Sequence, residues 1–173
     1  MGPVTAADFE ATPARHSATA AVAVAALAMA VIALNNPVMT LLAAAGVAVL
    51  AGGAFLGVRW AVTVGAAIVF VGNLLAATAG PATPPFVALL AGGLSVVAWD
   101  LGEHAIGLGE DVGGAARTTQ GELVHAALTL GVAMSAVALG YAIFLVGADG
   151  RPVLAIVFLA LGSFILFRTL RPD

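Results

Sequence analysis

The sequence predicts an all-α protein, a polytopic membrane helix bundle of about six transmembrane helices. Two observations predict this class: 62% of the 173 residues are apolar and only 9% are charged, whereas a soluble domain carries roughly 25% charged residues. A soluble fold of this size cannot bury so much apolar surface, so lipid has to cover it. Cysteine is absent, which excludes disulfides and thiolate metal sites. The net charge of −3 and the lack of a basic cluster argue against a nucleic-acid partner.

Six apolar stretches are long enough to cross a membrane, since a spanning helix needs roughly 20 mainly apolar residues. Proline, glycine, asparagine and charged residues separate these stretches. Their predicted bounds are residues 17–34, 38–58, 61–79, 86–101, 123–147 and 153–170. We therefore predict a short cytoplasmic N-terminal tail, residues 1–16, followed by a single six-helix transmembrane domain, residues 17–173.

The positions of the arginines predict the orientation of the bundle. Lysine is absent, and all six cations are arginine. With six spans, one side of the membrane holds both termini and five arginines: Arg15, Arg59, Arg117, Arg168 and Arg171. The other side holds only Arg151. By the positive-inside rule, both termini and the connection after the fourth span are cytoplasmic. The protein is then a multi-pass protein of the cell membrane.

Small residues in the spans predict how the helices pack, because lipid supplies no hydrophobic drive between them. Gly53 and Gly57 form a GxxxG pair, and Gly131 with Ser135 forms a similar small-residue pair. We interpret both as ordinary helix packing within one chain. The deepest polar residues of the spans are each expected to make an interhelical hydrogen bond: Asn73, Ser95, Ser135, Tyr141 and Ser163.

Residues 99–125 form the one polar segment of the chain. They hold eight charged or histidine residues, and the other 146 residues hold only ten more. On a helix turning 100° per residue, these eight side chains fall within an arc of about 140°. Such one-sidedness is typical of an amphipathic helix and not of a loop. The eight residues are Asp100, Glu103, His104, Glu110, Asp111, Arg117, Glu122 and His125.

Two geometries fit this segment. It could lie flat on the membrane surface, although surface helices usually present Lys and Arg to lipid headgroups and this face is acidic. Alternatively, the fourth and fifth helices extend past the membrane as a cytoplasmic hairpin that turns at Gly113-Gly114. We favour the hairpin, because it keeps the charges together and explains the glycines. It places Glu110 level with Arg117 as an ion pair.

The hairpin would also bring two glutamates and two histidines to one height. Glu122 and His125 are spaced i, i+3, as in helical di-metal carboxylate sites, and imidazole with carboxylate suits Zn, Fe or Mn. The candidate ligands are Glu103, His104, Glu122 and His125, with Asp100 and His104 as another pairing. A hydrated hairpin whose acids and histidines pair with each other and with Arg117 explains the pattern without a metal. We favour that interpretation and expect no cofactor.

The polar segment also carries a resemblance. The runs WD-x-GE at 99–103, LGE at 108–110, ART at 116–118 and E-x-VH at 122–125 resemble a haloarchaeal family of small multi-spanning membrane proteins. Members of that family resemble proteins encoded beside MoxR-type AAA+ ATPases and proteins with von Willebrand factor A-like domains. The resemblance implies an accessory membrane subunit near an ATPase-driven assembly or maturation system.

Three functions remain open from the sequence. We favour a non-enzymatic accessory or scaffold subunit that presents the acidic hairpin to a cytoplasmic protein partner and that could form homo-oligomers. Its partner-binding residues are predicted to be Asp100, Glu103, Glu110, Asp111, Arg117 and Glu122. The second is a metal-binding membrane protein or enzyme that uses the Glu and His residues named above. The third is a small channel or carrier for a neutral or lipidic solute, which would need a continuous cavity between helices. No catalytic sequence motif is present.

Overall fold

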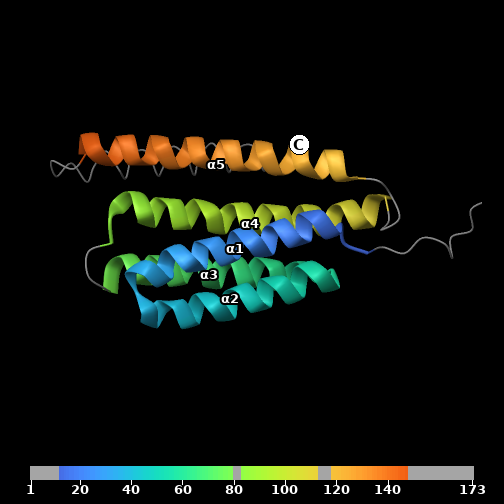
Figure 1. Cartoon of the computed structure of the whole chain (residues 1–173), viewed down its shortest axis with the longest axis horizontal. Helices are drawn as coiled ribbons and strands as arrows, with labels where there is room; N and C mark the ends of the chain where they lie inside the picture. The colour runs from blue at the N-terminus through green and yellow to red at the C-terminus, as the bar shows by residue number, and fades with distance from the viewer. Residues whose placement is uncertain (1–11, 80–82, 113–117, 148–173) are drawn as a thin grey trace, which may run out of the picture. The chain divides into compact units, whose positions relative to one another are not determined.

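The protein is described by a computed structural model that covers residues 12–79, 83–112 and 118–147. Over these residues it consists of five helices and no strand: α1 (Arg15–Asn35), α2 (Pro37–Leu56), α3 (Arg59–Ala79), α4 (Pro85–Val112) and α5 (Thr119–Gly147) (Figure 1). All five are long and apolar enough to cross a membrane. The all-α class is therefore confirmed, and a helix of sufficient length and apolarity is found at each of the first five predicted spans. The predicted sixth span and the Gly113-Gly114 turn lie outside the described residues.

The chain divides into two compact units, residues 1–137 and residues 138–173. In the first unit, α1 packs against α2 and α4, and α3 packs against the same two helices (Figure 1). In the second unit, the described residues are the end of α5, where the rings of Tyr141 and Phe144 stack with centroids 6.4 Å apart.

The first break between helices is set by local chemistry that the sequence predicts. The side chain of Asn36 accepts a hydrogen bond from the backbone N–H of Met39, at 3.3 Å, and so caps α2. Pro37 occupies the first turn, where a missing N–H costs nothing. α2 ends at Leu56 and is capped by Gly57, whose φ of 72° is the left-handed conformation that favours glycine.

Glycines allow α2 and α3 to approach at backbone distance. A Cβ atom on Gly53 would lie 2.6 Å from the backbone nitrogen of Val62, and one on Gly46 would lie 2.8 Å from the carbonyl oxygen of Gly65. Gly46 and Gly53 are seven residues apart, so they share one face of α2. Gly57 serves as a helix cap, so the predicted GxxxG pair is replaced in the packing by Gly46 and Gly53. Gly131 of the second predicted pair has open space around it.

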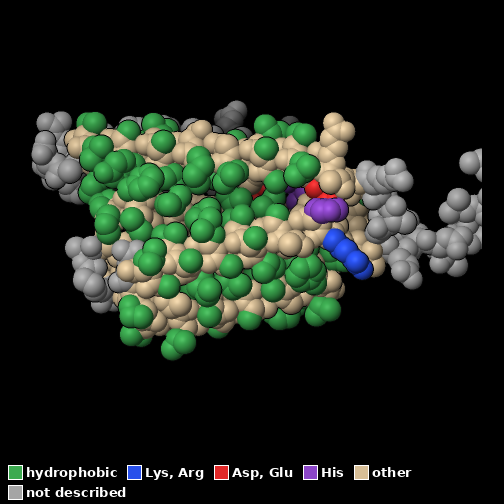
Figure 2. Space-filling model, viewed as in Figure 1, with side chains coloured by type: hydrophobic (Ala, Val, Ile, Leu, Met, Phe, Trp, Pro, Cys, Tyr) green, Lys and Arg blue, Asp and Glu red, His purple; other side chains and the backbone are tan. Residues whose placement is uncertain are grey.

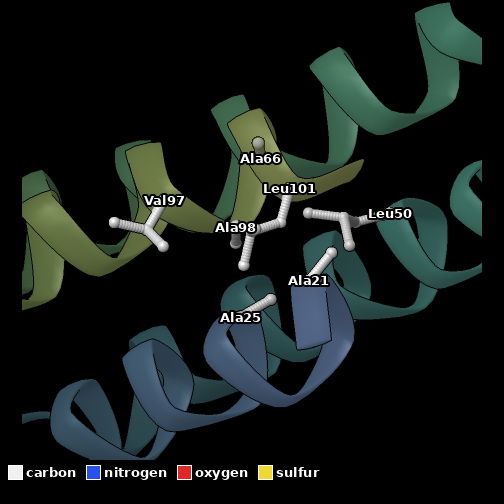
Figure 3. Packing of buried hydrophobic residues seen from close by; sticks show 7 residues of the cluster. All are labelled: Ala21, Ala25, Leu50, Ala66, Val97, Ala98 and Leu101. Carbon is white, nitrogen blue, oxygen red and sulfur yellow. The ribbon is translucent and has the colours of Figure 1, made fainter. Parts of the chain in front are cut away.

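The interior of α1–α4 is filled by apolar side chains. One buried cluster joins all four helices at mid-length and consists of Ala21, Ala25, Leu50, Ala66, Val97, Ala98 and Leu101 (Figure 3). Two further apolar clusters fill the interior around Ile32 and Val69 and around Val62 and Ile106. Small alanines dominate these contacts, as expected where helices pack closely within a membrane.

The deep polar residues are satisfied by backbone oxygens. Asn73 donates to the carbonyl oxygen of Ala88 at 2.9 Å and so links α3 to α4. This confirms the predicted interhelical bond. Ser95 and Ser135 instead donate within their own helices, each to the residue four positions earlier, at 2.8 Å. Ser163 lies outside the described residues.

The outer surface is largely apolar. Hydrophobic side chains are spread over the visible face, while the charged and histidine side chains on this face gather toward one end (Figure 2). Most of the large exposed apolar residues are leucines and valines. Large exposed apolar areas are typical of a surface that meets lipid. On the first-unit part of α5, Leu123, Leu128 and Val132 are 65%, 65% and 71% exposed.

Candidate functional site

The polar residues of 99–125 that the structure describes lie on α4 and at the start of α5, where they form three separate networks. Each network joins a different pair of helices: α3 with α4, α4 with α5, and α1 with α5. The single polar face predicted on a helical wheel therefore contacts several neighbours.

The first network joins α3 to α4 through a forked arginine. The Nη1 atom of Arg59 donates to Glu103 Oε2 at 2.8 Å, and its Nη2 atom donates to Glu110 Oε2 at 2.6 Å. Glu103 and Glu110 lie two turns apart on the same face of α4. The Thr63 hydroxyl donates to Glu103 Oε1 at 3.3 Å, and the indole N–H of Trp99 donates to that hydroxyl at 3.2 Å.

The second network joins α4 to α5. Asp100 Oδ2 lies 2.7 Å from His125 Nε2 and accepts a hydrogen bond from the Thr129 hydroxyl at 2.8 Å. The rings of His104 and His125 stack, with centroids 3.8 Å apart and planes 12° apart. The Nε2 atom of His104 is buried and makes no hydrogen bond within the described part of the chain. The two rings present parallel faces, so their nitrogens do not converge on a common point.

The third network places a buried carboxylate at the start of α1. Glu122, which is only 3% exposed, accepts the backbone N–H of Ser17 at 2.7 Å and the Thr118 hydroxyl at 2.8 Å. His16 Nδ1 lies 3.6 Å from Glu122 Oε1, the oxygen that also accepts from Thr118. The residue at the N-cap of α1 is Ala14, which has no side-chain oxygen to cap the helix. Glu122 of α5 thus supplies the cap that α1 lacks, and its charge also suits the positive end of the helix dipole.

The segment before α1 crosses α4 at a glycine. The backbone N–H of Ala14 donates to the carbonyl oxygen of Ala105 at 2.8 Å. A Cβ on Gly109 would collide with the backbone of Thr12 and Pro13, so only glycine leaves room for this crossing. Beside it lies a pocket of about 280 Å³, bounded by the starts of α1 and α5 and the end of α4. Glu122 lines this pocket.

The structure brings some of the candidate metal ligands together and separates others. His104 and His125 are in contact, whereas Glu103 turns to Arg59 and Glu122 turns to α1. Among the described residues, no group of three or more His, Asp or Glu side chains is arranged to hold a metal ion.

The predicted partner-binding residues divide into inward and outward groups. Glu122 is buried, and Asp100 and Glu103 are engaged by neighbouring helices. Glu110 keeps 53% of its side chain exposed, and Asp111 is exposed at the end of α4. Arg117 lies outside the described residues. Glu110 is paired with Arg59. From the sequence, Arg59 predicts only the membrane orientation and not this ion pair.

Sequence reasoning missed the partners of the acidic face. They are Arg59 and Thr63 of α3, Thr129 of α5 and the backbone of Ser17. One signal was available: Arg59 directly precedes the 61–79 span, at the same predicted end of the bundle as the acidic residues that follow the fourth span.

Arg59→Lys should weaken the first network, because a lysine ammonium is a point charge and cannot replace the planar fork that holds two carboxylates. We expect a loss of about 0.5 kcal/mol in the free energy of unfolding at low salt, since the pairs are partly exposed. Thermal unfolding in detergent at low and high salt measures this loss, and salt should reduce the difference from the wild type. Equal stability of Arg59→Lys and wild type at low salt would show that one carboxylate partner suffices.

These features define a class of protein: an all-α, multi-spanning membrane protein, in whose described part most charged residues lie on α4 and at the start of α5. The chain belongs to DUF7519, a family of unknown function, which it matches over residues 11–167. No curated protein and no solved structure matches the chain.

Proposed function

We propose that this protein is a non-enzymatic accessory or scaffold subunit of the cell membrane, whose cytoplasmic end binds a protein partner through the acidic end of α4. The main support is that some acidic residues of the polar face pair with neighbouring helices, while others remain exposed. Glu103 and Glu122 pair with α3 and α1, whereas Asp111 is exposed and Glu110, although paired with Arg59, keeps 53% of its side chain exposed at the end of the helix. A rigid bundle with an exposed acidic end is suited to recognition, because surface charges speed association and select partners.

The packing of the bundle favours this role over transport. A channel or carrier needs a polar or open path between helices, whereas α1–α4 enclose three apolar clusters at successive heights. The deep residues Asn73 and Ser95 bond to backbone oxygens. The resemblance of residues 99–125 to the MoxR-associated family supports a partner from an ATPase-driven assembly system.

Neutralising the exposed pair with Glu110→Gln and Asp111→Asn should reduce recovery of the partner at least about tenfold, as expected for loss of a charge-dependent contact. The measurement is gentle detergent extraction from the native membrane, followed by quantitative mass spectrometry of proteins that co-purify in fixed ratio. The matched control is Glu110→Asp with Asp111→Glu, which keeps both charges and should retain the partner. Undiminished recovery with the neutral pair would contradict the proposal.

A further inference from the structure

A groove of about 290 Å³ lies between α3 and α4 on the outer surface of the bundle. Ala66 and Ser95 are buried and form its floor, while the larger residues on its edges are about half exposed. The residues that line it are Thr63, Ala66, Ala67, Phe70, Val71, Ser95, Val96 and Trp99. The groove is therefore a hollow of small residues between two aromatic side chains, and its lining is almost wholly apolar.

The surroundings of the groove indicate a hydrocarbon occupant. Both helices that form it are apolar and long enough to cross the membrane. The medium next to their outer faces is then lipid, in which an apolar hollow fills with a hydrocarbon chain. Phe70 and Trp99 are 44% and 40% exposed, so both rings can contact such a chain along the groove.

The groove is continuous with a charged group at its polar end. Thr63 lines the groove and also donates to Glu103, and Trp99 is fixed by its hydrogen bond to the same hydroxyl. Arg59 then joins Glu103 to Glu110. The rise from Glu103 to Glu110, about 10 Å along a helix, extends from the groove into the depth of a lipid headgroup layer.

This charged group favours one kind of headgroup. It contains one guanidinium, Arg59, and two carboxylates, Glu103 and Glu110, so one negative charge remains unbalanced. Both Nη atoms of the guanidinium already face carboxylates. An anionic headgroup would meet the surplus carboxylate charge and be repelled, whereas an ammonium group would be attracted and could donate to Glu110.

We propose that the groove binds one hydrocarbon chain of a membrane phospholipid whose headgroup carries an ammonium group, and that Glu110 contacts this ammonium. The lipid site shares Glu110 with the acidic end proposed above as a partner surface, whereas the groove residues lie outside that surface. Quenching of Trp99 tests the groove, and recovery of the partner tests the acidic end. The fluorescence of Trp99 monitors the groove directly. The protein has only two tryptophans, so in Trp60→Phe all tryptophan fluorescence comes from Trp99.

The test is quenching of Trp99 fluorescence in the full-length Trp60→Phe protein, reconstituted in mixed vesicles. In one series the brominated-chain lipid is phosphatidylethanolamine, and in the other it is phosphatidylglycerol, each diluted with the unbrominated form of the other lipid. Half-quenching should need about two- to fivefold less brominated phosphatidylethanolamine than brominated phosphatidylglycerol, the preference expected for one partly exposed charge pair.

Two variants test the hydrocarbon-chain contact and the headgroup contact separately. Ala67→Leu fills the groove and should lower quenching by both lipids, whereas Ala44→Leu, on an exposed position of α2, should leave it unchanged. Glu110→Gln removes the surplus charge and should abolish the preference while quenching persists. Identical curves for the two lipids would overturn the headgroup assignment. Absence of quenching by both would show that a second copy or another protein segment covers the groove, and would overturn the site.

Discussion

Gly53→Ala should destabilise the protein strongly, while Gly52→Ala at the neighbouring position should be neutral or slightly stabilising. A methyl group on Gly53 would lie 2.6 Å from the backbone nitrogen of Val62 and 2.9 Å from the carbonyl carbon of Ala61. Backbone cannot rotate away as a side chain can, so α2 and α3 would have to separate. We expect a loss of about 2 to 3 kcal/mol from overpacking. At Gly52 nothing lies within 4 Å, so only the gain in helix propensity remains, about 0.5–1 kcal/mol.

The measurement is the midpoint of reversible unfolding in mixed detergent micelles for both variants. Gly102 offers a second control, because a Cβ there would meet the Cγ1 atom of Val62, a side chain, at 2.6 Å. Gly102→Ala should therefore be rescued by Val62→Ala, whereas Gly53→Ala should not be. If Gly53→Ala and Gly52→Ala unfold at the same midpoint, α2 and α3 do not pack at backbone distance.

The helix bounds could be predicted from sequence because local chemistry determines them. The predicted break at Asn36 and Pro37 is the cap of α2, and the break after residue 79 follows from the proline-rich run that precedes α4. The predicted fourth span ended at residue 101, whereas α4 continues to Val112. That continuation agrees with the amphipathic pattern of residues 99–125, because the helical spacing of polar and apolar residues there predicts a helix.

The contacts of the polar face could not be predicted in the same way. A helical wheel shows that Glu103 and Glu110 share a face, but it does not show which helix lies opposite. Arg59 is 44 residues from Glu103 in sequence, and Ser17 is 105 residues from Glu122. Such pairings depend on the packing order of the helices, which the glycines of α2 and α3 help to set. The predicted partner of Glu110, Arg117, lies outside the described residues. The structure pairs Glu110 with Arg59, a partner that the helical wheel did not provide.

Removing the carboxylate of Glu122 should destabilise the start of α1. In Glu122→Ala, the backbone N–H of Ser17 stays buried and loses its acceptor, and the Thr118 hydroxyl loses its acceptor too. We expect a loss of about 3 kcal/mol, since a buried donor is left without a partner and a charge-assisted bond is removed. Glu122→Gln keeps an oxygen for Ser17 and loses the interaction with the helix dipole, so about 1 kcal/mol should be lost. Asp111→Asn, at an exposed position, is the control.

A new cap on α1 should rescue the Glu122→Ala variant. Ala14 occupies the N-cap in an extended conformation, with φ −66° and ψ 114°, which suits an aspartate at that position. Ala14→Asp should recover about 1 kcal/mol in the Glu122→Ala background and little in the wild type, where Ser17 N–H already has a partner. Hydrogen exchange of the Ser17 amide should be faster in Glu122→Ala and slower again in the double variant. If exchange at Ser17 is the same in all three proteins, the carboxylate does not cap α1, and Glu122 would then be available for another role.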